Sequence, residues 1–417
     1  MLVSGVACHI ILAALNCIAS TIGVGILNMP SAVAQVGLVP GTVIFLFGIL
    51  GSLLTGLQLY ELTEVYVFLP LRDNGTQRSI EEAVATNDPE ADRLLESRRQ
   101  DTPQAPVTRI PYLQIAFKLF GQPGMVIVLV AMVCTAIGAN CVCLIAVADN
   151  LENIWEEWSK RAVILAATFL GICLVWTPIH EFKPEDGPPP TPQLTFATLV
   201  KTFGSILFSF AGHTGYPTYH AQMREDHQHF KASLLGTYEY MGIMLIPFAF
   251  VTPHLWGTAV ADNLLSSLPP NSTVYAINIL ITIHIFFAIS PWVMPLSDLL
   301  NFVVFHHFQA PNLEHHQYIF PICVQAVACL VAIAFADSFA VVMSFMGATF
   351  MACLTFVFPS ILYMTHLRNK GGYTTDPWGF ACHGLASFLI VAGGVLALVF
   401  TLYFTAVDML NTKAGGD

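Results

Sequence analysis

The sequence predicts an all-α, polytopic integral membrane protein in which residues 1–417 form one transmembrane domain. Hydrophobic residues make up 55% of the chain and charged residues only 10%, whereas soluble domains carry about 25% charged residues. Long apolar segments recur along the chain, and no Asp, Glu, Lys or Arg occurs before Glu61. The net charge of −11 comes without a basic domain, which argues against nucleic acid as a partner and leaves the lipid bilayer.

Ten segments of the chain are long and apolar enough to be helices that cross the bilayer, since a crossing needs about 20 such residues. They lie near residues 6–35, 40–66, 122–149, 160–179, 202–220, 234–256, 274–297, 318–335, 338–365 and 380–407. Gly37-Leu-Val-Pro-Gly41 is the predicted turn between the first two helices. The N-terminus has no basic region and no obvious cleavage site, so we interpret segment 6–35 as a retained helix.

Residues 70–109 differ from the rest of the chain because they are polar, rich in proline and mixed in charge. This composition predicts a mostly disordered loop. The basic residues between the second and third helices are Arg72, Arg78, Arg93, Arg98, Arg99, Arg109 and Lys118. The positive-inside rule therefore places this loop and the N-terminus in the cytosol. The amphipathic stretch 111–120 is expected to lie along the inner membrane surface before Gly121 opens the third helix.

The first predicted helix carries Gly23, Gly25 and Pro30 within eight residues. Such residues favour a break in the helix. At membrane depth a break is tolerated where it faces protein or a cavity, and in transporters it is where substrate and coupling ion bind. The alternative is a kinked helix whose small residues form a helix contact.

A second stretch, Thr202-Phe-Gly-Ser-Ile-Leu-Phe-Ser-Phe-Ala-Gly-His-Thr-Gly-Tyr-Pro217, has the same character. It combines an apolar helix with Gly212, Gly215 and Pro217, and it adds the polar His213. Two interrupted segments in corresponding positions of two halves are the best sequence pointer to a transporter site.

These two stretches carry a resemblance to a known family. Gly23-Val-Gly-Ile-Leu-Asn-Met-Pro30 resembles the first-helix G-x-G-I-L-x-x-P of the amino acid/auxin permease family. Phe208-Ser-Phe-Ala-Gly-His-Thr-Gly-Tyr-Pro217, followed by Met223, is similar to that family's F-x-F-x-G-H-x-x-x-P…M. The resemblance implies an amino-acid transporter of the amino acid–polyamine–organocation superfamily with a LeuT-like inverted repeat, and it implies eleven helices rather than ten.

The segment 180–201 is where the two helix counts diverge, because it is too polar and proline-rich to cross a membrane. Four later basic residues would lie outside if the helices simply alternated, and inside if one more helix stood between 180 and 201. They are Arg224, Lys231, Arg368 and Lys370. The family's fifth helix is therefore expected to be missing, through splicing or an incomplete gene model, unless the chain truly has ten helices.

The two breaks supply the candidate substrate site. Ser20, Thr21, Gly23 and Gly25 are expected to bind the carboxylate and amine of the substrate through backbone groups freed at the break. In the second break, the candidates are Gly212 for the same purpose and Phe208 and Phe210 for a side-chain pocket, with ordinary packing as the alternative for the two aromatics.

Two polar residues are candidates for ion coupling. His213 titrates near neutral pH and is predicted to sense or carry a proton, or else to brace the unwound backbone as a neutral histidine. Asn16 could ligate sodium, with an interhelical hydrogen bond as the alternative. We interpret His284 as structural, and we expect the histidines between His306 and His316 to be solvated rather than to bind a metal.

The sequence thus favours a secondary active transporter of small neutral amino acids, coupled to protons first and sodium second, with no cofactor and no enzymatic activity. The membrane is either the plasma membrane or an endo-lysosomal or vacuolar one. The alternative is a non-transporting sensor or regulatory variant. The sequon at Asn271 would face the lumen or exterior and be glycosylated, whereas that at Asn74 would stay unmodified.

Overall fold

The computed structural model describes residues 2–21, 25–68, 110–155, 194–268, 270–285, 319–335, 339–371 and 377–414. Within these ranges the chain is helical and contains no β-strand. The predicted loop 70–109, the predicted helix 160–179, most of the connection 180–201 and the histidines between His306 and His316 lie outside the described residues.

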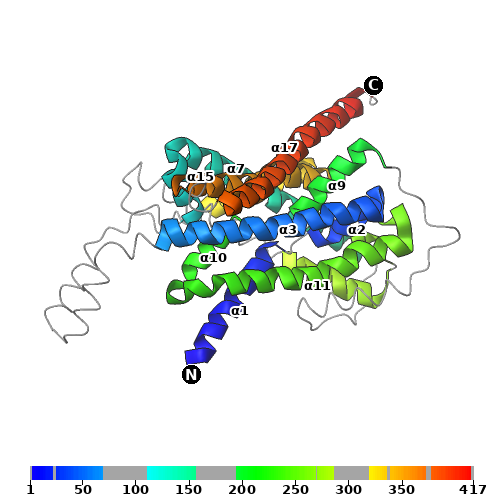
Figure 1. Ribbon diagram of the computed structural model, residues 1–417. Helices are drawn as coiled ribbons and strands as arrows, with labels where there is room; N and C mark the ends of the chain where they lie inside the picture. The colour runs from blue at the N-terminus through cyan, green and yellow to red at the C-terminus, as the bar shows by residue number, and fades with distance from the viewer. Residues whose placement is uncertain are drawn as a thin grey trace, which may run out of the picture.

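The helices follow the apolar segments of the sequence (Figure 1). Their bounds are α1 Leu2–Thr21, α2 Gly25–Val36, α3 Leu38–Thr63, α7 Pro111–Trp155, α9 Phe196–Phe208, α10 Tyr216–Gln222, α11 Phe230–Trp256, α13 Ile319–Ala334, α14 Phe339–Met346, α15 Phe358–Asn369 and α17 Pro377–Ala414, with a further helix at Ser272–Ile285. Short π-helical segments are η1 Glu64–Phe68, η7 Gly347–Met351 and η8 Cys353–Val357, and η3 Arg224–His229 is a 3₁₀ helix.

Among the residues that the structure describes, five helical stretches are long and apolar enough to cross a membrane. They are Leu38–Phe68, Pro111–Ala146, Asp226–Ala259, Phe339–Asn369 and Pro377–Phe404. Shorter apolar helices accompany them, and large apolar side chains such as Leu50 and Phe388 are exposed on α3 and α17. Such exposure suits a surface that faces lipid, so the predicted all-α polytopic membrane protein is confirmed.

Helix α3 crosses the middle of the molecule, with α11 on one side and α15 and α17 on the other (Figure 1). The Gln58 side chain on α3 donates a hydrogen bond to the Ser387 hydroxyl on α17 over 3.1 Å. On the opposite side, the Tyr238 hydroxyl of α11 contacts the Ser52 hydroxyl of α3. Helix α3 therefore joins the two sides of the bundle through buried polar contacts.

Two sequence expectations about local structure can be compared with the observed helices. The predicted turn at residues 37–41 was wrong in extent, because Gly37 alone (φ 86°) separates α2 from α3. Pro40 fits the first turn of α3, where a proline leaves no intrahelical donor missing. The change of direction at Gly121 (φ 67°) is confirmed within α7.

The second predicted interruption is present, whereas the first falls on residues that the structure does not describe. Helix α1 is described as far as Thr21 and α2 from Gly25, with residues 22–24 outside the described part. Pro30, which was expected to belong to the break, lies inside α2. The second segment leaves the helix after Phe208 and resumes at Tyr216, where Pro217 occupies the first turn of α10.

Helix α9 packs very closely on the π-helical segment η7, because glycines face each other. A Cβ atom on Gly347 would lie 2.0 Å from the carbonyl oxygen of Gly204, and one on Gly204 would lie 2.3 Å from the carbonyl oxygen of Ser344. Small residues permit this backbone contact, which is how membrane helices commonly associate.

We therefore expect Gly347→Ala to destabilise the protein by about 1–3 kcal/mol, as overpacking does. Gly236→Ala on α11 is the matched control, because nothing lies within 4 Å of a Cβ there. That control should hold or raise stability, since alanine favours helix over glycine. Thermal unfolding of both variants in detergent measures the difference, and equal melting temperatures would contradict the close packing.

Candidate functional site

The two segments with predicted breaks meet at Gly25 and Ser209. Helix α2 begins at Gly25, and α9 ends one residue before Ser209. A Cβ atom on Gly25 would lie 2.3 Å from the Ser209 Oγ and 2.7 Å from its Cα, so glycine is what permits this approach. Farther along the same helices, the Thr202 hydroxyl donates to the Ala32 carbonyl over 3.0 Å.

The second segment also approaches the end of α1. A Cβ atom on Gly212 would lie 2.1 Å from the Thr21 Oγ1. Ser20 and Thr21 are both buried, and their hydroxyls donate to the Cys17 carbonyl over 3.0 and 2.7 Å. Both bonds are of the local kind that Ser and Thr hydroxyls form with a helix carbonyl three or four residues earlier. Thr21 and Gly212 are therefore brought together with Ser20 beside them, whereas Gly23 lies outside the described residues.

A chain of buried hydroxyl groups runs from this point to α3. The Thr21 Oγ1 lies 3.1 Å from the Tyr216 hydroxyl, and that hydroxyl lies 3.3 Å from the Tyr238 hydroxyl. Tyr238 contacts Ser52, whose hydroxyl donates to the Phe210 carbonyl over 3.1 Å. Four helical elements, α1, α10, α11 and α3, thus supply one polar core between the breaks.

His213 is buried in the second break and is held by α3. Its Nε2 lies 3.0 Å from the Ser52 carbonyl oxygen and 2.9 Å from the Thr55 Oγ1. A carbonyl only accepts, so Nε2 carries the hydrogen and donates. The other nitrogen, Nδ1, is buried and has no hydrogen-bond partner among the described residues. One nitrogen therefore braces the backbone of α3, and the other remains able to accept a proton or a donor group.

The two predicted pocket aromatics point into different clusters. Phe210 is fully buried and packs edge-on against Phe45, with ring centroids 5.6 Å apart. A Cβ on Gly48 would touch its ring at 2.7 Å, so Phe210 fills a space on α3. Phe208 belongs instead to the cluster that contains Leu27 of α2. The structure thus does not bring Phe208 and Phe210 into one pocket wall.

The remaining predicted residues lie outside the polar core described above. Asn16 is half-buried on α1. His284 lies in the helix Ser272–Ile285. Asn271 stands directly before that helix, where its side-chain oxygen accepts the backbone N–H of Val274 over 2.9 Å and so caps the helix. The Asn271 side-chain amide nitrogen, which is the atom that a glycan would modify, takes no part in this hydrogen bond.

Asn140 on α7 is a candidate that the sequence analysis missed. It is fully buried, and neither its amide nitrogen nor its amide oxygen has a hydrogen-bond partner in the ranges that the structure describes. Its neighbours Ala139 and Cys141 belong to the same apolar cluster as Phe208. Buried amides are nearly always paired, so one without a partner suits a ligand contact. The available signal was a polar residue in the middle of an apolar segment.

The hydroxyl residues of the polar core were also missed. Ser52, Thr55 and Tyr238 lie in predicted membrane helices, and although Gly51 and Gly56 stand beside the first two, no combination of glycine and proline marks a break there. Only their contacts with His213 and Tyr216 in the folded chain identify them.

Comparison with known proteins connects this arrangement to a family. The sequence profile described as transmembrane amino acid transporter protein matches residues 9–184 and 184–407. The chain belongs to the transmembrane amino acid transporter family. A comparison with curated proteins found no match.

Membership of the transmembrane amino acid transporter family confirms the resemblance drawn from the two glycine-rich motifs. The family consists of transporters of amino acids, so the chain is an integral multi-pass membrane protein with an amino acid as its class of substrate. The two matched ranges contain one predicted break each, and the structure places the described residues that flank those breaks against each other.

We expect Gly25→Ala to abolish transport by this family member and to lower its stability, because the new methyl group would overlap Ser209. In the double variant with Ser209→Gly, the Oγ and Cβ atoms are gone and only the contact with the Cα at 2.7 Å remains. Partial recovery of stability in the double variant, measured by thermal unfolding, supports the contact. Strictly additive losses would contradict it, since residues in contact are coupled.

Proposed function

We propose that this protein is a secondary active transporter of small neutral amino acids that works by alternating access around the two breaks. The observation that carries the proposal is the meeting of both interrupted segments at a buried polar core. In such transporters, freed backbone N–H groups bind the substrate carboxylate and freed carbonyls bind the ammonium or a cation. Ser20, Thr21, Gly23, Gly25 and Gly212 are the proposed substrate-binding residues.

The charge of the buried residues supports a neutral substrate. Among the described residues, the buried polar side chains are hydroxyls, amides and histidines, and none is Asp or Glu. A charged substrate side chain would enter without a compensating charge, which costs several kcal/mol. A zwitterion can instead be neutralised by the helix ends at the breaks.

Coupling is proposed to protons first and to sodium second. His213 lies in the second break with Nδ1 without a partner among the described residues, which supports a proton acceptor. Its two contacts through Nε2 support the bracing alternative equally directly. Asn16 is the proposed sodium ligand in the runner-up scheme, and Asn140 is a further candidate for either ion or substrate.

The number of helices bears on whether this form transports. The two profile matches join at residue 184, inside the polar connection 180–201 where the fifth helix is proposed to be missing. If that helix is truly absent, the first repeat is incomplete, and the alternative is a sensor or a regulator of a full-length form. The LeuT-like inverted repeat is likewise a proposal, and so is the location in the plasma membrane or in an endo-lysosomal or vacuolar membrane.

Uptake of labelled neutral amino acids into proteoliposomes tests the function. We expect saturable uptake that depends on an inward proton gradient and collapses when the gradient is dissipated. A requirement for sodium would favour Asn16, whose alanine variant would then lose uptake. No uptake by well-folded protein would contradict the transporter and favour the regulator. Asn140→Ala should reduce uptake without unfolding the chain.

Replacing His213 with glutamine distinguishes its two possible roles, which are to carry a proton and to brace the backbone of α3. Glutamine keeps an N–H donor for the Ser52 carbonyl but cannot titrate. If His213 carries the proton, His213→Gln retains substrate-driven exchange but loses its response to the proton gradient. A response equal to wild type would assign the bracing role. His213→Ala leaves the Ser52 carbonyl without this donor, so about 1–3 kcal/mol of stability should be lost. His254→Ala, at an exposed position, is the control.

The topology is tested by glycosylation. We expect Asn271 to carry a glycan when the chain is made in a eukaryotic cell, and Asn271→Gln to run at the mass of deglycosylated protein. Asn74→Gln should leave the mass unchanged, because the loop 70–109 is predicted to be cytosolic. A glycan on Asn74 would invert the proposed topology.

A further inference from the structure

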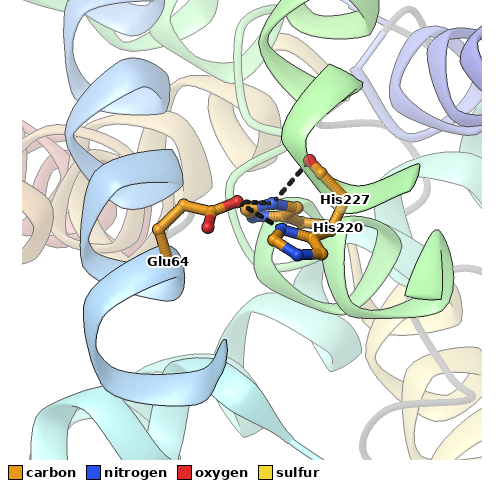
Figure 2. Close-up of side chains that lie close together, drawn as sticks. All are labelled: Glu64, His220 and His227. Atoms are coloured by element: carbon orange, nitrogen blue, oxygen red, sulfur yellow. Dashed lines mark hydrogen bonds and ion pairs between the residues drawn. The ribbon is translucent and has the colours of Figure 1, made fainter. Parts of the chain in front are cut away.

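Glu64, His220 and His227 form a cluster separate from the interrupted-helix site (Figure 2). The Glu64 Oε1 lies 2.9 Å from the His220 Nε2 and 2.7 Å from the His227 Nδ1. The three potential ligand atoms all lie within 4.8 Å of one another. In the part of the chain that the structure describes, this is the one such group of three or more.

The cluster joins elements that are far apart in the sequence. Glu64 reaches out from η1, the π-helical end of α3, toward the two imidazole rings (Figure 2). His220 lies in the last turn of α10, directly after the second break, and His227 lies in η3. A ligand held by all three would therefore connect α3 to the α10–η3 segment.

Aromatic side chains fix the orientation of both rings. The His220 ring stacks on Tyr60 and on Phe230, with centroids 5.0 and 4.7 Å apart. The His227 ring stacks on Phe68 at 4.1 Å. Ligating imidazoles need such fixed orientations, which other proteins obtain through hydrogen bonds around the ligands. The rings are therefore held in place before any ion binds.

The cluster is open to water on one side. The His220 side chain is fully buried, whereas those of Glu64 and His227 are 25% and 29% exposed. An ion can thus reach the Glu64 carboxylate and His227 from solvent, and His220 can coordinate it from the buried side. In the present arrangement the two ring nitrogens donate their N–H groups to Glu64. In the other tautomer the same nitrogens would point lone pairs in those directions, toward a bound ion.

We propose that Glu64, His220 and His227 bind a transition-metal dication of the Zn²⁺ type. Two imidazoles and one carboxylate form the ligand set of open zinc sites, which keep a fourth position for water. Imidazole nitrogen selects zinc and its neighbours over magnesium and calcium, which prefer oxygen. Ligands about 2.0–2.1 Å from a tetrahedral ion lie a little over 3 Å apart. The two Glu64 contacts of 2.9 and 2.7 Å would therefore lengthen slightly, and the two imidazole nitrogens, which lie within 4.8 Å of each other, would settle at a similar spacing.

The bound ion would hold the segment after the second break against α3. This consequence rests on the proposed function, because it matters only if α10 moves during alternating access. Under that condition the metal inhibits transport, and it does so from the side that the charge pattern predicts to be cytosolic. The binding itself does not depend on transport.

The test is titration of the purified, detergent-solubilised protein with Zn²⁺ alone, after treatment with a chelator. We expect one tight site per chain. His227→Ala and Glu64→Gln should each weaken binding by more than the roughly 10–100-fold that loss of an outer-shell partner costs. His220 is left unchanged because its buried ring supports the fold. Mg²⁺ in excess should not displace the zinc.

His229→Ala is the matched control, since His229 lies in the same η3 helix but outside the cluster. Zinc affinity that is equal in wild type, His227→Ala and Glu64→Gln would overturn the site, as would an equal loss in His229→Ala. Zinc should also lower uptake by proteoliposomes of wild type but not of His227→Ala. Zinc binding without any uptake would leave the site standing and refute the transporter, whereas uptake without zinc binding would do the reverse.

Discussion

A backbone amide or carbonyl that leaves a helix inside a membrane must find another partner, and residues 209–215 show how this chain meets that constraint. Part of the demand is met by tight turns, in which the N–H groups of Ser209 and Phe210 donate to carbonyls three residues earlier. The Phe210 carbonyl then accepts from Ser52, and His213 donates back to the Ser52 carbonyl. One position of α3 therefore serves the break with both its side chain and its backbone.

That requirement explains the composition of one face of α3. Gly48, Ser52 and Gly56 recur at intervals of four residues, which places them on one side of the helix. Gly48 makes room for the Phe210 ring, Ser52 contacts the break, and Gly56 lies against Tyr216 and Leu234. Small residues at this spacing let membrane helices approach closely. Here they bring a polar helix face to the unwound segment, and the bulkier apolar residues of α3, such as Leu50, face outward.

The sequence allowed the membrane fold, most of the described helices and the second break to be predicted, because apolar length and glycine or proline are local signals. It did not allow the polar core to be predicted. Ser52, Thr55 and Tyr238 become recognisable only once helices distant in the sequence pack together. The same holds for Asn140, whose lack of a partner among the described residues is a property of the folded chain. Phe208 and Phe210 show the converse limit, since two aromatics two residues apart were grouped by sequence and separated by packing.

The proposed metal cluster and the second break share the same two elements, and this links them physically. Ser52 and Glu64 are both carried by the α3–η1 helix, roughly 18 Å apart at the usual rise per residue. Tyr216 and His220 are likewise carried by α10, one helical turn apart. A tie between Glu64 and His220 would therefore limit how far α10 can move from α3 at that point. Because the Tyr216 hydroxyl of the polar core is carried by the same short helix, one turn from His220, its movement would be limited as well.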